Sequence, residues 1–357
     1  MSELDPTLYT VAWIAPLEIE AQAALHMFDN IHPGGFRTSQ GDDYLFYAGD
    51  VCGHNVVLAT LPAGQEYGTG SAAALASQVK KCFPHLWFGL LVGVAAGLPH
   101  LSCSPPRDIR LGDILVALPE GGSPAVVAYD LGKEAGAGGL QLLRAGHVLA
   151  TTDTIVRAAI GKIKADHPNE ARRFLPYYQS MKEKGHTAGN FTDPGQDRDV
   201  LYGADEQPIQ REWRPDAGRT RVWYGPIGSG DKLMRHAQKR DELRDMYNLI
   251  GLEMEAAGTM NHIRVGVIRG VCDYGDERKN KEWQPYAAAM AAAYAKAILR
   301  EIFAPPSKNP AMAAAPVASG HQPTPQEPAR FVFNGPISGR NVQTGLSFSG
   351  PTTFNFN

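Results

Sequence analysis

The sequence predicts an α/β domain over residues 1–303, and three observations predict it. Apolar runs with the length of strands alternate with segments of helical periodicity throughout this part of the chain. The run at residues 86–94 is almost wholly apolar, which is typical of a strand covered on both faces. Glycine-rich turns are expected after strands, where open α/β sheets bind their ligands.

The elements expected before residue 165 are short and closely spaced. Residues 10–14 are an apolar strand, and residues 18–28 are a helix because Ile19, Ala23 and Met27 recur at helical spacing. The remaining elements are paired strands at 44–48 and 55–61, a strand-to-helix turn at 61–71, a helix at 72–82, strands at 86–94, 110–117 and 125–129, and helical material at 140–164.

The elements expected after residue 165 include one long irregular segment. Residues 182–219 are polar and rich in Gly, Asp and Pro without a clear period, so they are interpreted as an insertion that forms a lid or shapes the site. The regular elements are a continued helix at 171–178, a strand at 220–227, a helical stretch from residue 232, a strand at 265–271 and an Ala-rich helix at 284–302 that closes the core.

Composition excludes several classes of function. The 357 residues are 43% hydrophobic and carry a net charge of −3, which gives no sign of a surface for nucleic acid or an anionic membrane. The four cysteines lie far apart, without the spacing of a zinc site or a disulfide framework. No apolar run reaches the ~18 residues of a membrane span, and the polar N-terminus lacks a signal-peptide core. We therefore expect a soluble cytoplasmic protein without a metal or a cofactor.

The segment GLEMEAAGTMNHIRVGVIRGVCDYGDE, residues 251–277, is the centre of the predicted site. Alternation in a short extended segment places Glu253 and Glu255 on one face and Met254 on the other. The strand that follows delivers Asp273 at its carboxyl end. Each acid alone has a structural alternative, because an Asp after a strand often forms a turn and a Glu at a helix start is often solvated. Together they predict two acidic groups in one cleft.

Two glycine-rich stretches are further candidates for contact with a ligand. In LPAGQEYGTGS, residues 61–71, backbone N–H groups and the hydroxyls of Thr69 and Ser71 would face a polar ligand, or the stretch is a plain loop that caps a helix. GVAAG, residues 93–97, is expected to be a turn that lets a ligand approach the backbone closely. The second stretch lacks GxGxxG and GxxxxGK[ST], so it predicts neither a dinucleotide site nor a P-loop.

The character of the chain changes after residue 303. Residues 304–328 are rich in Pro, Ala, Ser and Gln and are expected to form a flexible linker. Residues 329–357 form a Gly/Asn/aromatic tail in which FNGP at 333–336 is echoed by FSGP at 348–351. Such a tail either stacks in a cross-β fashion, or is disordered, or lies as a hairpin on the domain.

An ordered series of motifs resembles the superfamily of purine nucleoside phosphorylases and methylthioadenosine/S-adenosylhomocysteine nucleosidases. The resemblance covers residues 9–299 and is strongest to the fungal branch, whose members are free-standing purine nucleosidases or leading domains of NACHT or NB-ARC receptors. It implies a three-layer α/β/α sandwich around a mixed, partly barrel-like sheet, and a homo-oligomer that is a dimer or higher. The motifs are VAWIAPLEIEAQAAL, LPAGQEYGTGSAA, LLVGVAAGLP, RLGDILVA, GSGDKLM, GLEMEAAG and VIRGVCDYGDERKNKEWQPYAAAMAAAYAKAIL.

The resemblance also implies roles for individual residues. Glu20 matches the acid that activates water, Glu255 the glutamate that binds the ribose hydroxyls, and Asp273 the acid that protonates purine N7. The expected substrate contacts are Met254 under the ribose, Arg269 on the strand before Asp273, Leu233 and Met234 at the base, Trp283 as an aromatic cover, and Glu253, Val94, Ala95, Gly97, Thr69 and Ser71.

The expected activity is therefore that of a purine nucleosidase acting on adenosine, inosine or guanosine. Phosphorylases of this fold hold phosphate with arginines and a Ser or Thr, because a dianion needs charged donors. The matching position here is Val94, and the first loop offers Glu18 and Glu20 but no arginine. Water is therefore the expected nucleophile.

Three alternatives stay open from the sequence. A phosphorylase of the same fold is possible if Arg107, Arg110 or an arginine of a neighbouring subunit holds phosphate. The chain also fits the nucleosidase effector of a fungal immune-type signalling system, with residues 329–357 as an amyloid-like receiver. Finally, a 5'-phosphorylated substrate such as AMP or ATP is possible, with the insertion at 182–219 carrying basic groups to the pocket.

Overall fold

The structure is a computed structural model that describes residues 2–64, 67–134, 140–148, 150–183, 191–203 and 206–304. The expected tail at 329–357 lies outside these residues, as do the linker beyond Ala304 and part of the expected insertion at 182–219. The roles expected of the linker and the tail therefore stay predictions.

Most described strands belong to one mixed sheet of eleven strands, in which β5 (Phe88–Gly97) is central. One path runs β10-β6-β13-β5-β1-β4-β3-β2, while β12, β11 and β7 branch from the end of β5. Within the described residues no strand pairing joins the ends of the two branches, so these strands do not close into a barrel. The bounds are β1 (Val11–Ile14), β2 (Asn30–Ile31), β3 (Phe46–Val51), β4 (His54–Ala59), β6 (Ile114–Ala117), β7 (Val126–Ala128), β10 (Val222–Gly225), β11 (Ile227–Ser229), β12 (Gly251–Glu253), β13 (Val265–Asp273) and, in a separate pair, β8 (Gly132–Glu134) and β9 (Leu140–Leu142).

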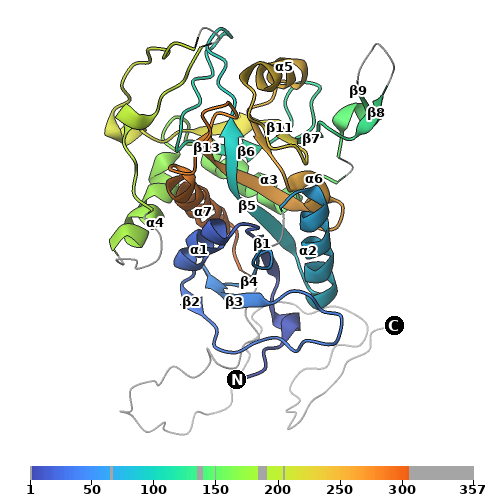
Figure 1. The fold of residues 1–357 in the computed structure, drawn as a ribbon. Coiled ribbons are helices and arrows are strands. Elements are labelled where there is room, and N and C mark those ends of the chain that lie inside the picture. The colour runs from blue at the N-terminus through green and yellow to red at the C-terminus, as the bar shows by residue number, and fades with distance from the viewer. Residues whose placement is uncertain are drawn as a thin grey trace, which may run out of the picture. The chain divides into compact units, whose positions relative to one another are not determined.

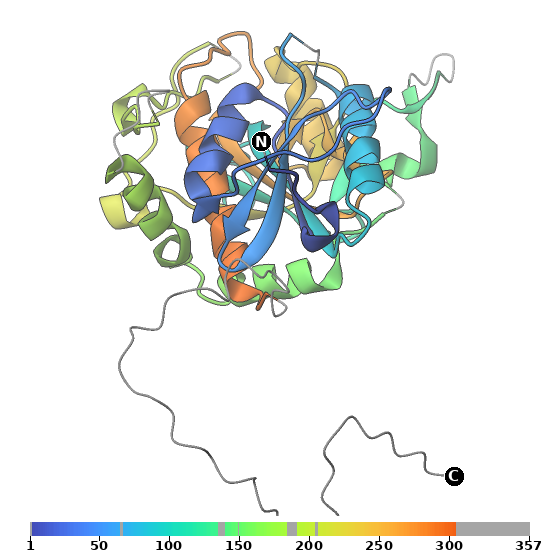
Figure 2. The same cartoon turned by 90° about the horizontal axis from the view of Figure 1, so that it is seen from below.

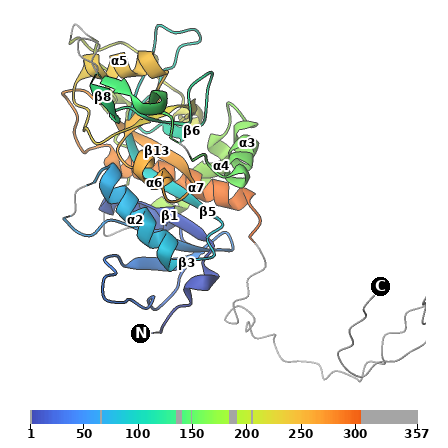
Figure 3. The same ribbon diagram turned by 90° about the vertical axis from the view of Figure 1, so that its right-hand side faces the viewer.

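Helices cover the sheet on both sides, which confirms the predicted three-layer α/β/α class. Figure 2 shows the blue α1 and orange α7 on one side of the strands and the cyan α2 on the other. In the two side views α5 lies near one end of the domain and β3 near the other (Figures 1 and 3). The helices are α1 (Glu18–Met27), α2 (Thr69–Cys82), α3 (Thr154–Lys164), α4 (Ala171–Glu183), α5 (Ala237–Tyr247), α6 (Ala256–Met260) and α7 (Gln284–Glu301).

The core forms around the parallel strands β1, β5 and β13. Val11 pairs with Phe88 on one side of β5, and Val265 pairs with Gly89 on the other. These strands are buried on both faces, which explains their nearly continuous apolar sequences. The Ala-rich α7 packs directly on β13, and a Cβ at Gly270 would overlap the backbone of Ala287. Small residues on both elements therefore allow this close contact.

The topology brings the predicted site residues to one edge of the sheet. Because β1, β5 and β13 are parallel, their carboxyl ends lie together, at the loop to α1, at Gly97 and at Asp273. β12 runs antiparallel to the end of β5, where Leu252 pairs with Ala96. This pairing brings Glu253 to the same edge.

The structure corrects the expected turn at residues 93–97. These residues are the last part of β5, because Val94 and Ala95 still pair with β13 and Gly97 pairs with Gly251 of β12. The ladder therefore continues past the point where the small residues suggested a turn. Their small size instead lets neighbouring side chains pack against the strand.

Three expected helical boundaries are also wrong. Residues 140–142 form β9, so only the later part of 140–164 is helical. Residues 171–183 form the separate helix α4, because α3 ends at Lys164 and Pro168 lies in the turn between the two helices. The stretch from Lys232 is not helical until Ala237, where His236 caps the helix by accepting a hydrogen bond from the Lys239 N–H.

The described part of the 182–219 insertion is packed onto the domain. Arg214 is buried and forms an ion pair of 2.7 Å with the buried Asp113. Arg211 lies 3.0 Å from Asp199 and donates to the hydroxyl of Tyr274, next to the end of β13. Within the described residues, no helix has the length and apolar character needed to cross a membrane.

Candidate active site

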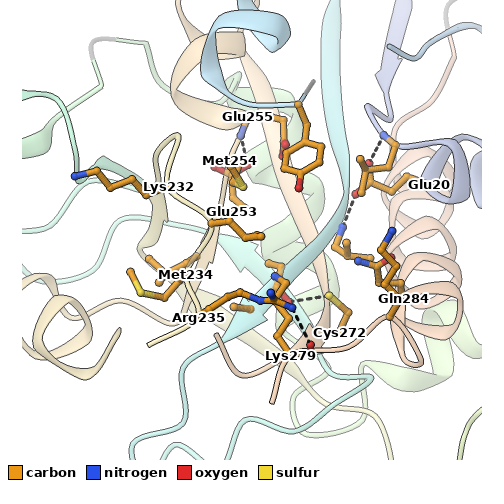
Figure 4. Close-up of a pocket in the computed structure, with 18 of the residues that line it drawn as sticks. Glu20, Lys232, Met234, Arg235, Glu253, Met254, Glu255, Cys272, Lys279 and Gln284 are labelled. Carbon is orange, nitrogen blue, oxygen red and sulfur yellow. Dashed lines mark hydrogen bonds between the residues drawn. The ribbon is translucent and has the colours of Figure 1, made fainter. Parts of the chain in front are cut away.

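A cavity of about 230 Å³ lies at the edge where β1, β5, β12 and β13 meet (Figure 4). Glu20 lies on one side of it, and Glu253, Met254 and Glu255 lie on another, as the close-up shows. Eight of the predicted site residues line the cavity: Glu20, Val94, Ala95, Leu233, Met234, Glu253, Met254 and Glu255.

Behind the cavity wall, the fully buried Arg269 joins three carboxylates into one cluster. Its Nη2 donates to Glu253 and, at 3.0 Å, to Glu255, while its Nη1 lies 3.7 Å from Glu20. Glu253 also accepts from the backbone N–H groups of Glu255 and Ala256 at the start of α6. One guanidinium therefore faces three carboxyl groups, and the cluster is net negative when all of them are ionised.

Glu20 is held at the cavity by two backbone N–H groups, one at the start of α1 and one in β5. Its Oε2 accepts from the Leu17 N–H and its Oε1 from the Val94 N–H, both at 2.8 Å. The side chain is buried in the first turn of α1, where a carboxylate interacts favourably with the helix dipole. Each carboxylate oxygen keeps a second lone pair, so Glu20 can still accept a proton from a molecule in the cavity.

Burial raises the pKa of two of these carboxyl groups. Removal from water raises the pKa of Glu255 to about 8, because Arg269 offsets only part of that penalty and Glu253 and Glu20 add repulsion. Burial likewise raises the pKa of Glu20, against the opposing effects of Arg269 and the two backbone N–H groups. These two carboxyl groups therefore hold protons at a pH where ordinary glutamates have lost them.

These raised pKa values predict that the ligand-free protein loses stability as the pH rises. A carboxyl group with a pKa near 4.5 when unfolded and about 8 when folded binds more protons in the folded state between those values. The melting temperature is expected to fall from pH 5 to pH 9, with the contribution of Glu255 lost as the pH passes 8. Thermal denaturation across this range checks it. Glu255→Gln should flatten the curve, and a variant with the wild-type slope would contradict the assignment.

Gly93 makes room for the contact between Glu20 and Arg269. A Cβ at this position would overlap Glu20 Oε1 and crowd Arg269 Nη1. Gly93→Ala is therefore expected to destabilise the protein by about 1–3 kcal/mol, as overpacking in cores does, and to lower activity. Gly161→Ala in α3 is the matched control, because its Cβ meets nothing within 4 Å and the helix gains up to ~1 kcal/mol. Equal stability of both variants, measured by urea denaturation, would contradict this account.

Asp273 ends β13 in a buried position beside the cavity, but it does not line the cavity itself. Its Oδ1 accepts from the Gly275 N–H at 2.8 Å, and its Oδ2 accepts from the Cys272 thiol at 3.1 Å. Lys279 Nζ lies 2.9 Å from the same Oδ2. Asp273 lines a second cavity of about 200 Å³, and Cys272, Lys279 and Asn280 line both cavities.

Four predicted contacts lie away from the main cavity. Thr69 donates through its N–H and its hydroxyl to Asp231, and Ser71 lies further along α2. Gly97 is packed against Val271 and Ile109. Trp283 is buried just before α7 and lines the second cavity, together with Asp273.

The residues missed from the sequence are mostly cationic or aromatic. Lys279 was not singled out, although it contacts Asp273, because a lysine in the polar stretch DERKNKEWQ carries no periodic or motif signal. The other missed side chains on the cavity include Tyr67, Tyr129, Lys232, Arg235 and Lys281. No described residue of 182–219 lines this cavity, so its basic groups come from the segments at 232–235 and 279–281 instead.

The two arginines considered as phosphate ligands do not line the cavity either. Arg110 is buried against Asp108, with Nη2 and Oδ2 2.6 Å apart. Arg107 contacts His100 and the backbone carbonyl of Asn248. In the described part of the chain, no group of three or more His, Cys, Asp or Glu side chains is placed to hold a metal ion.

Comparison with known proteins identifies the fold. No protein-family model matches the chain. It is 37% identical over 307 residues to a nucleotide-binding leucine-rich repeat (NLR)-like protein of Hyaloscypha variabilis; the match covers 83% of this chain and 30% of that protein.

Solved structures also align with the chain. One is 5'-methylthioadenosine/S-adenosylhomocysteine nucleosidase from Neisseria meningitidis, in complex with methylthio-immucillin-A. It aligns with a TM-score of 0.53 and 20% identity, over 83% of this chain and 100% of that one. Futalosine hydrolase of Helicobacter pylori aligns with a TM-score of 0.54 and 15% identity, over 84% and 100%. The chain therefore has the same fold as these two solved proteins.

Proposed function

We propose that the protein is a purine nucleosidase, which hydrolyses the N-glycosidic bond of a purine ribonucleoside to free base and ribose. One observation carries the proposal: Glu20, Met254, Glu255 and Lys279 line one cavity, and Lys279 pairs with Asp273 beside it. The solved structures with this fold include proteins described as nucleosidases and a hydrolase of futalosine. Assembly into a homo-oligomer stays a prediction.

The chemistry of glycoside cleavage gives each group a role. As the bond from C1' to the base lengthens, positive charge develops on the ribosyl ring and negative charge on the purine. Glu255, when ionised, anchors the ribose hydroxyls and stabilises the positive charge. Glu20 accepts the proton of the water that attacks C1', and its raised pKa makes it a stronger base once it is ionised. The Asp273-Lys279 pair lies at the cavity to balance the negative charge that develops on the purine at N7.

The cluster around Arg269 favours water over phosphate as the nucleophile. The single guanidinium contacts three carboxyl groups, those of Glu20, Glu253 and Glu255. Its positive charge is balanced by these groups and cannot also balance a phosphate dianion. The cavity wall beside Glu20 is formed by Leu17 and Val94, which offer no charged side chain. When Glu20 and Glu255 are ionised, a phosphate at C1' would therefore meet repulsion.

Product analysis tests this proposal directly. Purified protein is incubated with adenosine, inosine and guanosine, each with and without inorganic phosphate, and the products are separated by chromatography. We expect free base and ribose at a rate indifferent to phosphate. Ribose 1-phosphate that forms only with phosphate would establish a phosphorylase instead. A protein that cleaves none of these nucleosides, nor their 5'-phosphates, would contradict the proposal altogether.

A second candidate substrate is a purine nucleoside with a 5'-phosphate, such as AMP or ATP. Four cationic side chains line the cavity: Lys232, Arg235, Lys279 and Lys281. The carboxylates of Glu20 and Glu255 lie on other parts of its wall (Figure 4). Lys232 and Lys281 are exposed and make no ion pair with a described residue. A cavity with carboxylates around the ribose and cations elsewhere on its wall matches a substrate with a phosphate at 5'.

Steady-state kinetics with adenosine and AMP discriminate between these substrates. If phosphate is bound, the double variant Lys232→Gln, Lys281→Gln is expected to raise KM for AMP by about tenfold or more, since hydrogen bonds to charged groups contribute ~1.5–3 kcal/mol. KM for adenosine should stay within about twofold. Lys80→Gln, exposed on α2, is the matched control. Equal changes in KM for both substrates would exclude a phosphate-specific role.

A further inference from the structure

Lys279 lies between the active-site cavity and the acid expected to serve the leaving base. Asp273 lines the second cavity and not the first, and its Oδ2 contacts the Lys279 ammonium at 2.9 Å. Lys279 lines both cavities and is the member of the pair that reaches the wall of the first one. In Figure 4 its side chain lies beside Cys272, across the cavity from Glu255.

The surroundings fix this arrangement. Asp273 is tied at Oδ1 to the Gly275 N–H and at Oδ2 to the Cys272 thiol, so its carboxyl group cannot turn into the cavity without losing both contacts. The Lys279 backbone is also held, because its N–H donates to the Asp276 carbonyl and its own carbonyl accepts from Arg235 Nη2. Burial lowers the pKa of Lys279, but the neighbouring Asp273 and Cys272 outweigh this effect and raise it overall. Lys279 is therefore an ammonium at neutral pH.

We propose that Lys279 is a further catalytic residue of the reaction proposed above: its ammonium faces the departing purine and neutralises it at N7, while Asp273 positions the ammonium. The inference rests on the nucleosidase function and changes which group touches the base. Asp273 then acts as a positioning residue.

The step balances in atoms and charge. The bond between C1' and N9 breaks, and its electron pair goes to the purine. The Lys279 ammonium donates a hydrogen bond to N7 and keeps its proton, because Asp273 holds its pKa high. Water supplies the new oxygen at C1' and gives its proton to Glu20. Glu20 releases that proton to solvent, and the departing purine anion takes a proton from solvent.

A nucleoside whose purine leaves without developing a negative charge can distinguish this catalytic role from a purely structural ion pair. In 7-methylguanosine, N7 already carries a methyl group and the purine is cationic, so the base leaves without protonation. The Lys279 ammonium then does not speed the departure of the purine, and it repels the cationic base. A structural role for the pair would affect guanosine and 7-methylguanosine alike.

The experiment compares kcat and KM for these two nucleosides in wild type, Lys279→Gln and Lys279→Arg. Glutamine keeps a hydrogen-bond donor for Asp273 without the charge, and arginine restores the charge. We expect Lys279→Gln to lower kcat for guanosine by about 100-fold or more, the range for removing one preorganised donor that faces a developing negative charge. For 7-methylguanosine kcat should stay within about threefold and KM should fall. Lys279→Arg should recover at least about tenfold of the loss on guanosine.

The other outcomes are equally informative. Equal losses on both nucleosides, with a lowered melting temperature, would make the pair structural and overturn the inference, as would an unchanged kcat for guanosine. If Lys279→Gln does not fold, Lys279→Arg decides, because a full loss on both nucleosides would again overturn it. Lys239→Gln, an exposed lysine on α5, is the matched control. Wild-type protein that cleaves neither nucleoside would instead refute the nucleosidase function itself.

Discussion

Replacing Glu20 by glutamine is expected to lower kcat for hydrolysis by about 10³-fold, within the 10²- to 10⁴-fold range of a general base. An amide cannot take a proton from water, so attack on C1' slows while the ribose and base contacts remain. KM for the nucleoside should therefore change little. The measurement is steady-state kinetics with the best nucleoside found by product analysis, at a pH where the wild type is most active.

The control for this variant lies two residues away. Glu18 is in the same first turn of α1 but is exposed, and its carboxylate accepts a hydrogen bond from Gln22, so Glu18→Gln should keep wild-type kinetics. The amide at position 20 faces two N–H donors with a single acceptor oxygen, so a loss of stability of about 1–3 kcal/mol is also expected. Added formate should partly rescue Glu20→Ala. A kcat for Glu20→Gln within about threefold of wild type would refute the role of base.

The core strands could be predicted from the sequence because burial on both faces leaves a plain signal. β1, β5 and β13 are apolar almost throughout, and each has the length of a strand. The boundaries that failed depend on partners elsewhere in the chain. β5 continues to Gly97 because β13 pairs with it as far as Ala96 and β12, more than 150 residues later, pairs with Ala96 and Gly97. No local pattern encodes such a partner.

The acids of the site were predictable for a similar reason, and its cations were not. Glu20, Glu255 and Asp273 lie beside strand ends or a helix start, where chain position restricts what a carboxylate does. Lys279 and Lys232 lie in polar loops, whose conformation follows from tertiary contacts such as the hydrogen bond from the His236 N–H to the Gly275 carbonyl. A lysine in a charged loop has the same local sequence signature whether it faces solvent or a cavity.

For Arg269 the sequence predicted the residue but not its position relative to the cavity. The sequence suggested an arginine near the substrate, whereas the structure places it behind the wall, where it joins Glu20, Glu253 and Glu255. Arg269 therefore affects the site through the carboxyl groups that it contacts. It keeps three carboxyl groups close together in a buried place, and their mutual repulsion contributes to the raised pKa of Glu255.

Replacing Asp273 by asparagine is expected to lower kcat for guanosine by about 10²- to 10⁴-fold, because the leaving base loses its source of positive charge. Asparagine keeps the size of the side chain and can still accept from the Gly275 N–H. It no longer attracts the Lys279 ammonium, which then moves away from N7. The measurement is the same pair of kinetic constants, with guanosine and 7-methylguanosine side by side.

Two comparisons make the Asp273→Asn result decisive. Glu277→Gln changes an exposed acid four residues along the same loop and should leave both rates unchanged. If Asp273 acts through Lys279, then the double variant Asp273→Asn, Lys279→Gln should be little worse than either single variant, since both remove one function. Losses that multiply would show two independent roles, with Asp273 reaching the base by itself. An Asp273→Asn variant with wild-type kcat for guanosine would refute the role of Asp273 in stabilising the leaving purine. Among the described residues, Asp273 is the carboxylate at the end of β13, beside the cavity.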